Sequence, residues 1–111
     1  MSSLNRIVQG NFNTVVKEVE NGIMNSSLSA SFEDDYNTMV GGKQVALRVF
    51  ERYTMMGGNR LTMSVLFTER ERDSVEIYAV TSGGGGGLVK IINWGEDSFL
   101  GTLERVLNDL F

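Results

Sequence analysis

Alternating apolar and polar residues fill the middle of this 111-residue chain, from Leu28 to Ala79. A period of two places every second side chain on the same face of a β-strand, so the region predicts strands rather than helices. Short glycine-rich or charged segments separate the runs and suit tight antiparallel connections. We therefore predict a β-meander of four strands. Its alternating positions are Leu28, Ala30 and Phe32; Val45, Leu47 and Val49; Leu61, Met63, Val65 and Phe67; and Val75, Ile77 and Ala79.

A helical period flanks the meander on both sides. Apolar residues recur at spacings of three and four in residues 12–23 and again in residues 99–110, which predicts two amphipathic helices. Asn11 can cap the first helix, and Lys17, Glu18 and Glu20 turn outward from its apolar stripe. The two stripes consist of Phe12, Val15, Val16, Val19 and Ile23, and of Phe99, Leu100, Leu103, Val106, Leu107 and Leu110.

Two further strands complete the predicted fold. Residues 4–9 lean toward a strand that Gly10 closes, and residues 88–94 are most simply a last, partly buried strand. Each helix supplies only one apolar stripe, so both helices cover one face of the sheet. We predict an α+β fold: one curved antiparallel sheet of about five to six strands with two helices on one face, in the order β-α-β-β-β-β-(β)-α. With 41% hydrophobic residues and no long linker, residues 1–111 form a single domain.

Composition excludes several classes of function. The chain has no cysteine and no histidine, which removes disulfides, thiolate nucleophiles, Cys/His zinc sites and Ser-His-Asp triads. A net charge of -4 disfavours nucleic acid and anionic membranes as partners. No signal peptide or long apolar run is present. We expect a cytoplasmic protein without a cofactor.

Five consecutive glycines, residues 83–87, raise the question of a phosphate-binding loop. The Walker pattern fails, because Leu88 and Val89 separate Gly87 from Lys90 and Ile91 follows the lysine. An anion-binding nest and a mobile flap over a ligand are alternatives. We favour a permissive loop between strands, since ordered glycines lose much backbone entropy.

The acidic segment at residues 32–36 lacks the spacing of a calcium loop, and consecutive carboxylates on a strand point to opposite faces. A solvated strand end is the favoured interpretation, and no metal site is predicted. An enzyme would need Glu33, Asp35, Arg48 and Arg52 to converge, and no spacing indicates that they do. Enzymatic activity is therefore not predicted.

The sheet face opposite the helices is the predicted functional surface. If the alternating positions listed above point toward the helices, the intervening residues form an apolar patch of roughly a few hundred Å² on the other side, a size that usually has a use. We predict a homodimer or a protein-binding interface there, with a solvent-facing sheet and a ligand groove as alternatives. The candidate interface residues are Arg48, Phe50, Arg52, Leu66, Tyr78 and Val80.

The two arginines in that set admit two interpretations. Arg48 and Arg52 lie on one side of their strand, where an arginine pair suits the binding of a carboxylate. We favour pairing of the arginines with Glu76 on a neighbouring strand, with their stems packed over Phe50.

Three segments, "SLSASFEDDY", "VFERYTMMGGNRLTMSV" and "AVTSGGGGGLVKIINWGEDSFLGTL", resemble a bacterial domain-of-unknown-function family numbered 6054. The resemblance covers nearly the whole chain and implies no activity, cofactor or catalytic residue. The topology is also similar to the helix-grip folds, which implies as an alternative a small hydrophobic ligand between helix and sheet. The rim of that pocket would consist of Gly83, Gly84, Gly85 and Trp94.

Overall fold

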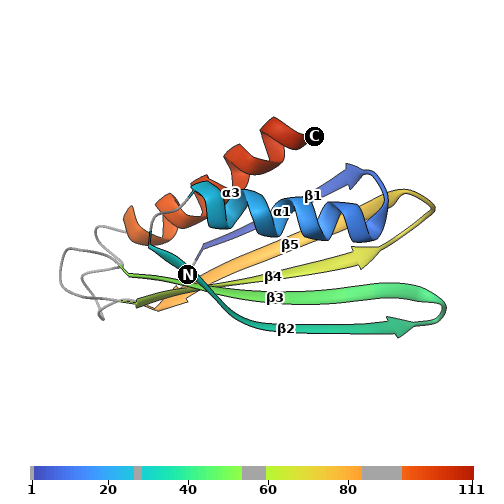
Figure 1. The fold of residues 1–111 in the computed structure, drawn as a ribbon, viewed down its shortest axis with the longest axis horizontal. Helices are drawn as coiled ribbons and strands as arrows, with labels where there is room; N and C mark the ends of the chain where they lie inside the picture. Colours follow the sequence, from blue (N-terminus) through green and yellow to red (C-terminus); the bar gives the residue numbers. More distant parts are fainter. Residues whose placement is uncertain (1, 27–28, 54–59, 84–93) are drawn as a thin grey trace.

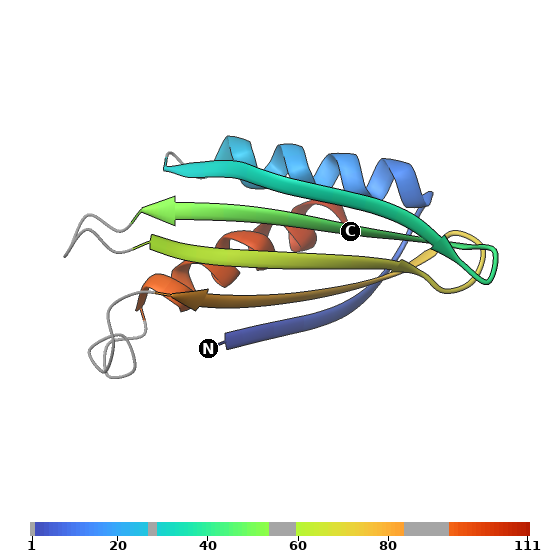
Figure 2. The same ribbon diagram turned by 90° about the horizontal axis from the view of Figure 1, so that it is seen from below.

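The computed structural model describes residues 2–26, 29–53, 60–83 and 94–111, and of residues 94–98 only the backbone. Two layers are present, a sheet and a pair of helices that lie on one of its faces (Figures 1 and 2). This confirms the α+β fold with both helices on one side of an antiparallel sheet. The elements are β1 (Ser2–Gln9), α1 (Phe12–Ser26), β2 (Ala30–Val40), β3 (Lys43–Tyr53), β4 (Arg60–Glu69), β5 (Ser74–Gly83) and α3 (Trp94–Leu110).

The sheet has the strand order β1-β5-β4-β3-β2, and every neighbouring pair is antiparallel. Strands β2 to β5 form the predicted meander. The first strand of the chain then pairs with the last described strand, so β1 and β2 are the two edges. In Figure 2 the helix-free face of the sheet is turned toward the reader, with both helices behind it.

Local sequence signals account for the helix start and for the turn between β2 and β3. The Asn11 side-chain oxygen accepts a hydrogen bond from the backbone N–H of Thr14 at 3.2 Å, which confirms the predicted cap. Gly41 and Gly42 have φ angles of 58° and 80°. Two consecutive positive φ values are what a two-residue hairpin turn with the twist of the strands requires, and glycine adopts them without steric strain.

The hydrophobic core fills the space between the helices and the sheet. The predicted stripe of α1 is buried throughout, and the α3 stripe is buried except for Leu110, which is exposed. Buried residues from strands β1, β3, β4 and β5 pack against these stripes. The largest fully buried side chains are Phe50, Phe67, Phe99, Ile23, Leu61, Met63, Ile77, Leu103 and Leu107.

The predicted inward and outward faces are right for β4 and β5 and wrong for β3. Phe50 is fully buried under the helices, whereas Leu47 and Val49 lie on the opposite face and are half-buried. The register is consistent with this, because Phe50 pairs with the buried Met63 and Leu47 pairs with Leu66. Neighbours across strands share a face, so all of β3 is inverted relative to the prediction.

The two ends of the meander also differ from the prediction. Strand β2 continues through the acidic segment to Val40, well beyond the alternating residues that predicted it. Trp94 begins helix α3 instead of ending a strand. The rest of the predicted last strand, residues 88–93, lies outside the described residues. The same holds for residues 57–59, one of the glycine-rich segments that separate the alternating runs.

Candidate functional site

A row of four apolar side chains crosses the helix-free face of the sheet. Tyr36 of β2 pairs with Leu47 of β3, Leu47 pairs with Leu66 of β4, and Leu66 pairs with Tyr78 of β5. We call these four residues the central row. Tyr36 is 63% exposed, Tyr78 42% and Leu66 38%. Since the row is uncharged and runs across four strands, it gives this face a continuous apolar centre.

Smaller apolar residues extend the central row along the strands. Val49 and Val45 lie next to Leu47 on the same face of β3, and Val80 lies next to Tyr78 on β5. Ile7, in edge strand β1, is 52% exposed and faces the same way. Large, solvent-accessible apolar patches of this kind usually mark an interaction site.

Two carboxylates on this face, Glu51 and Glu76, are paired with arginines within the chain. A third, Asp34, lies on edge strand β2 as the register partner of Val49. Glu51 forms an ion pair with Arg60 at 3.2 Å, and Arg60 also lies over the Tyr53 ring, 5.1 Å from its centre. Hydrogen bonding to Tyr53, followed by its charge and that of Glu51, raises the pKa of the Arg60 guanidinium. A guanidinium is in any case charged at neutral pH, so Arg60 neutralises Glu51 through their ion pair.

A second neutralised carboxylate, Glu76, lies toward the other end of the face. The Asn5 side-chain amide donates to Glu76 Oε2 at 2.9 Å, and Arg70 Nη1 donates to Oε1 at 2.7 Å. These two hydrogen bonds, with Asn5 as the larger cause, lower the pKa of Glu76 below its ordinary value. Glu76 therefore does not pair with Arg48 or Arg52 as the sequence analysis favoured.

The structure divides the six predicted interface residues between two faces. Leu66, Tyr78 and Val80 lie on the helix-free face as predicted. Arg48, Phe50 and Arg52 lie under the helices, because β3 is inverted; the Arg52 guanidinium, for example, lies 5.7 Å from the centre of the Phe99 ring. In their place β3 contributes Leu47, together with Val45 and Val49.

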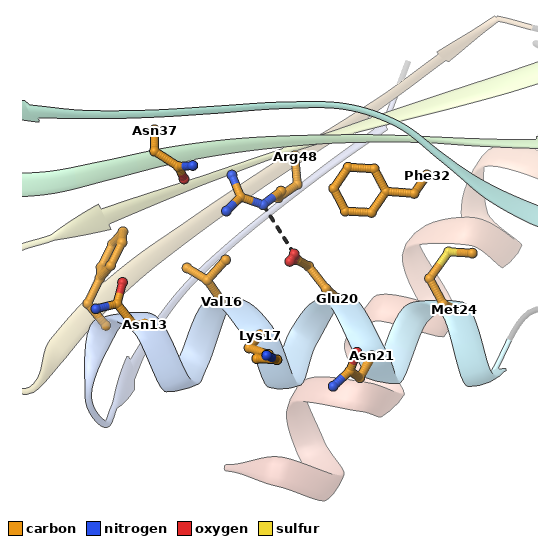
Figure 3. Close-up of a pocket in the computed structure, with 10 residues that line it drawn as sticks. Asn13, Val16, Lys17, Glu20, Asn21, Met24, Phe32, Asn37 and Arg48 are labelled. Carbon is orange, nitrogen blue, oxygen red and sulfur yellow. Dashed lines mark hydrogen bonds and ion pairs between the residues drawn. The ribbon is translucent and has the colours of Figure 1, made fainter.

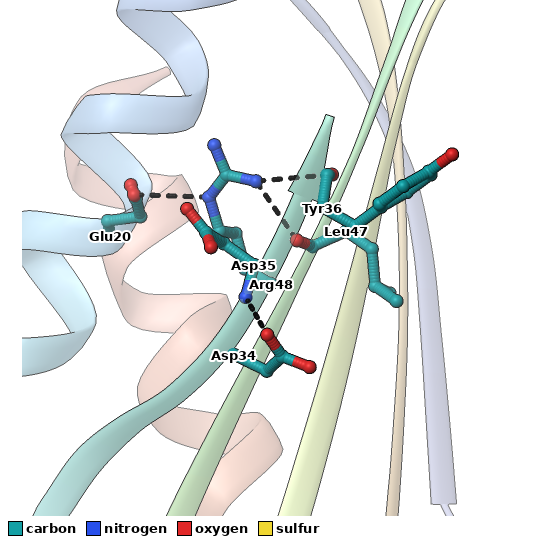
Figure 4. A network of polar contacts seen from close by, with 6 residues as sticks. All are labelled: Glu20, Asp34, Asp35, Tyr36, Leu47 and Arg48. Atoms are coloured by element: carbon teal, nitrogen blue, oxygen red, sulfur yellow. Dashed lines mark hydrogen bonds and ion pairs between the residues drawn. The ribbon is translucent and has the colours of Figure 1, made fainter. Parts of the chain in front are cut away.

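Arg48 lies on the helix side of the sheet and pairs with Glu20, which the helical periodicity predicts to face solvent. Arg48 Nε donates to Glu20 Oε2 at 3.2 Å, with the two side chains 10% and 20% exposed. Arg48 Nη1 also donates to the backbone oxygens of Leu47 at 2.9 Å and Tyr36 at 3.4 Å (Figure 4). Figure 4 also shows that the Tyr36 and Leu47 side chains point away from α1, on the other side of the sheet.

A groove opens beside this ion pair, between α1 and strands β2 and β3 (Figure 3). Its volume is about 380 Å³. Within the described ranges, Gly83 lines neither this groove nor the smaller one between β1 and α3. Of the rest of the predicted ligand-pocket rim, Gly84, Gly85 and the side chain of Trp94 lie outside what the structure describes.

The acidic segment lies on edge strand β2. Glu33 accepts a hydrogen bond from the Ser31 hydroxyl, and Asp34 accepts one from the backbone N–H of Asp35. Among the described residues no three acidic side chains are grouped closely enough to hold a metal ion. Exposed charges on an edge strand hinder pairing with a second sheet, which gives these carboxylates a structural role.

These features define the chain as an α+β module with one helix-covered and one open sheet face. The chain belongs to the family of unknown function DUF6054, whose sequence model covers residues 1–111. This confirms the resemblance found from the sequence. No curated protein matches the chain. None of the described helices is long and apolar enough to cross a membrane.

The solved structures that are similar to the chain include the following two. A protein of unknown function from Pseudomonas aeruginosa has a TM-score of 0.54 and 13% identity, over 74% of this chain and 70% of its own. A hypothetical protein from Helicobacter pylori has a TM-score of 0.48 and 13% identity, over 91% of this chain and 83% of its own. At this identity the likeness to the first shows a shared fold and nothing of function.

Proposed function

We propose that this protein is a non-enzymatic module that self-associates through the helix-free face of its sheet. The observation that carries the proposal is the central row, Tyr36, Leu47, Leu66 and Tyr78, which crosses four strands without a charge. The occupant that fits is a second copy of the same face, packed sheet against sheet about 10 Å apart.

The size of the face suits a dimer. Five strands about 4.8 Å apart and about ten residues long span roughly 20 by 30 Å. That area is close to the roughly 800 Å² per partner that stable interfaces bury. A homodimer also needs only one self-complementary patch, because a twofold axis brings each residue of the row opposite the same row in the partner.

The charges support a second copy as the occupant. The chain carries a net charge of -4, which would repel a second copy if the carboxylates of the contact face were free. Glu51 and Glu76 are instead neutralised by Arg60 and Arg70 at the margins of the face. The central row can then be desolvated while Glu51 and Glu76 stay paired, and Asp34 lies exposed on edge strand β2.

The test is the mass of the assembly in solution, measured by native mass spectrometry and by light scattering after gel filtration. We expect a dimer for the wild type at low micromolar concentration and a monomer for Leu66→Glu. Leu110→Glu is the matched control, because Leu110 is 39% exposed and Leu66 38%, but Leu110 lies on α3. This control adds the same charge and is expected to stay dimeric.

Two results would overturn the proposal. A wild type that stays monomeric up to high micromolar concentration contradicts self-association. The helix-free face would then be a binding surface for a different protein. A dimer that Leu110→Glu disrupts and Leu66→Glu leaves intact places the contact on the helix side. Far-ultraviolet circular dichroism of each variant shows whether a loss of dimer reflects loss of the fold.

A further inference from the structure

The groove between α1 and β2 surrounds a buried cation whose hydrogen-bonding capacity is only partly used. Arg48 is 8% exposed, and its Nε and Nη1 atoms are occupied by Glu20 and by two backbone oxygens. Its Nη2 atom has no hydrogen-bond partner among the residues that the structure describes. No fully buried side-chain nitrogen or oxygen of the described residues lacks a partner, so Nη2 keeps some solvent-accessible surface. Arg48 itself lines the groove.

The lining of the groove combines donors with apolar surface. Figure 3 shows Asn37 and Asn13 toward one end of the groove, with Arg48 and Glu20 between that end and Phe32 and Met24. The lining residues carry two positive charges, Lys17 and Arg48, against one negative charge, Glu20. Within the lining itself the ion pair leaves the charge of Lys17, and Asp35, the register partner of Arg48, lies on β2 outside the lining residues.

We propose that this groove binds a small monocarboxylate with an apolar body. The carboxylate accepts from Arg48 Nη2 and from the Asn37 amide, a pair of donors that suits two carboxylate oxygens. The apolar body contacts the side chains that line the rest of the groove. These are Phe12, Val16, Met24 and Phe32.

Size and charge narrow the class of ligand. The volume of about 380 Å³ lies at the low end of the range for small-molecule pockets, so a single-ring or short-chain acid fits. A dianion such as a phosphate monoester is disfavoured, because Glu20 lines the groove and Asp35, exposed on β2, is the register partner of Arg48. The site lies on the helix side of the sheet, so it does not depend on the proposed dimer.

The test is a titration of the ¹⁵N-labelled full chain with 3-phenylpropionate, followed by two-dimensional NMR. The neutral 3-phenylpropionamide, which has the same shape, is the parallel probe. We expect saturable shifts at Asn37, Arg48 and the residues of α1 around Glu20 with the acid, and binding at least about tenfold weaker with the amide. Equal binding of the two probes, or no saturable shift in this region, would overturn the proposal.

Two variants distinguish binding at this site from a general effect of added negative charge. Asn37→Asp places a carboxylate beside Arg48 on an exposed strand position, and we expect it to weaken binding of the acid about tenfold or more. Asn108→Asp adds the same charge on α3, where Arg6 already donates to residue 108 at 2.7 Å, and should leave binding unchanged. If Asn37→Asp binds as the wild type does, the assignment of the carboxylate to Arg48 and Asn37 is wrong.

Discussion

Gly22 of α1 lies directly against Val106 of α3: a Cβ atom added to Gly22 would come within 2.5 Å of Val106 Cγ1. Glycine is otherwise a poor helix residue, by about 1 kcal/mol relative to alanine. Here its missing side chain is what lets the two helices approach. We expect Gly22→Ala to lower the free energy of unfolding by about 1–2 kcal/mol, because overpacking against a branched side chain outweighs the gain in helix propensity. Urea denaturation measures the change.

The control for this prediction is the other described mid-helix glycine, Gly101. Among the described atoms, a Cβ there would meet only Arg105 Nη1, at 3.7 Å. Gly101→Ala should therefore stabilise the protein by up to about 1 kcal/mol. The double variant Gly22→Ala with Val106→Ala should recover part of the loss, since the methyl groups that clash are removed. Equal stabilisation by both glycine substitutions would show that the helices are not in close contact.

Phe50 and Leu66 distinguish the two faces of the sheet. Phe50 is fully buried between the helices and the sheet, so Phe50→Ala should lower the free energy of unfolding by about 3–5 kcal/mol. Leu66 is 38% exposed, so Leu66→Ala should lower it by less than about 1 kcal/mol in the monomer. Thermal unfolding at low protein concentration separates the two. Near-equal losses would contradict the inversion of β3.

The inversion of β3 explains why the sequence predicted the fold better than the site. Helical and strand periods are local, so element types and the two-layer arrangement follow from them. In β3, however, both faces carry apolar residues, with Val45, Leu47 and Val49 on one side and Phe50 on the other. The buried face of β3 is therefore assigned wrongly when the face with more aliphatic residues is taken as the buried one. The error affects the whole strand, because a shift of one residue moves every side chain to the opposite face.

The groove also depends on a contact that no local pattern contains. Glu20 stands at the flank of the α1 stripe, where an acid normally faces water. It turns inward because Arg48, 28 residues away in the sequence, lies opposite it. The cross-strand register that places Tyr36 beside Leu47 is likewise a tertiary relationship. Composition restricts the candidate chemistry, since a chain without cysteine and histidine leaves carboxylate, lysine, tyrosine and serine or threonine side chains.

The Glu20–Arg48 pair should contribute to stability mainly because each charge needs the other. Glu20→Ala leaves the Arg48 guanidinium mostly buried without its carboxylate, and we expect the free energy of unfolding to fall by up to about 3 kcal/mol. Arg60→Ala breaks an exposed ion pair with Glu51 and should change it by less than about 1 kcal/mol. Denaturation curves at neutral pH give the free energy of unfolding of both variants. A small effect of Glu20→Ala would mean that water solvates Arg48 through the groove.

The pKa of Glu76 tests whether this carboxylate, at the edge of the helix-free face, is paired within the chain. Hydrogen bonds from Asn5 and then Arg70 lower this pKa from its ordinary value of 4.5. A carboxyl group with a lowered folded-state pKa stabilises the fold fully above its unfolded pKa, and this contribution is lost as the pH falls through the folded value. We expect Asn5→Ala to raise the pKa of Glu76 in a carboxyl NMR titration, with little change in stability at neutral pH because the pair is exposed. Arg70→Gln should raise it as well, because Arg70 lowers the pKa through its hydrogen bond and its charge. A Glu76 pKa that does not move in Asn5→Ala would contradict the hydrogen bond from β1 to β5. One that does not move in Arg70→Gln would contradict the neutralisation of Glu76 that supports the proposed dimer.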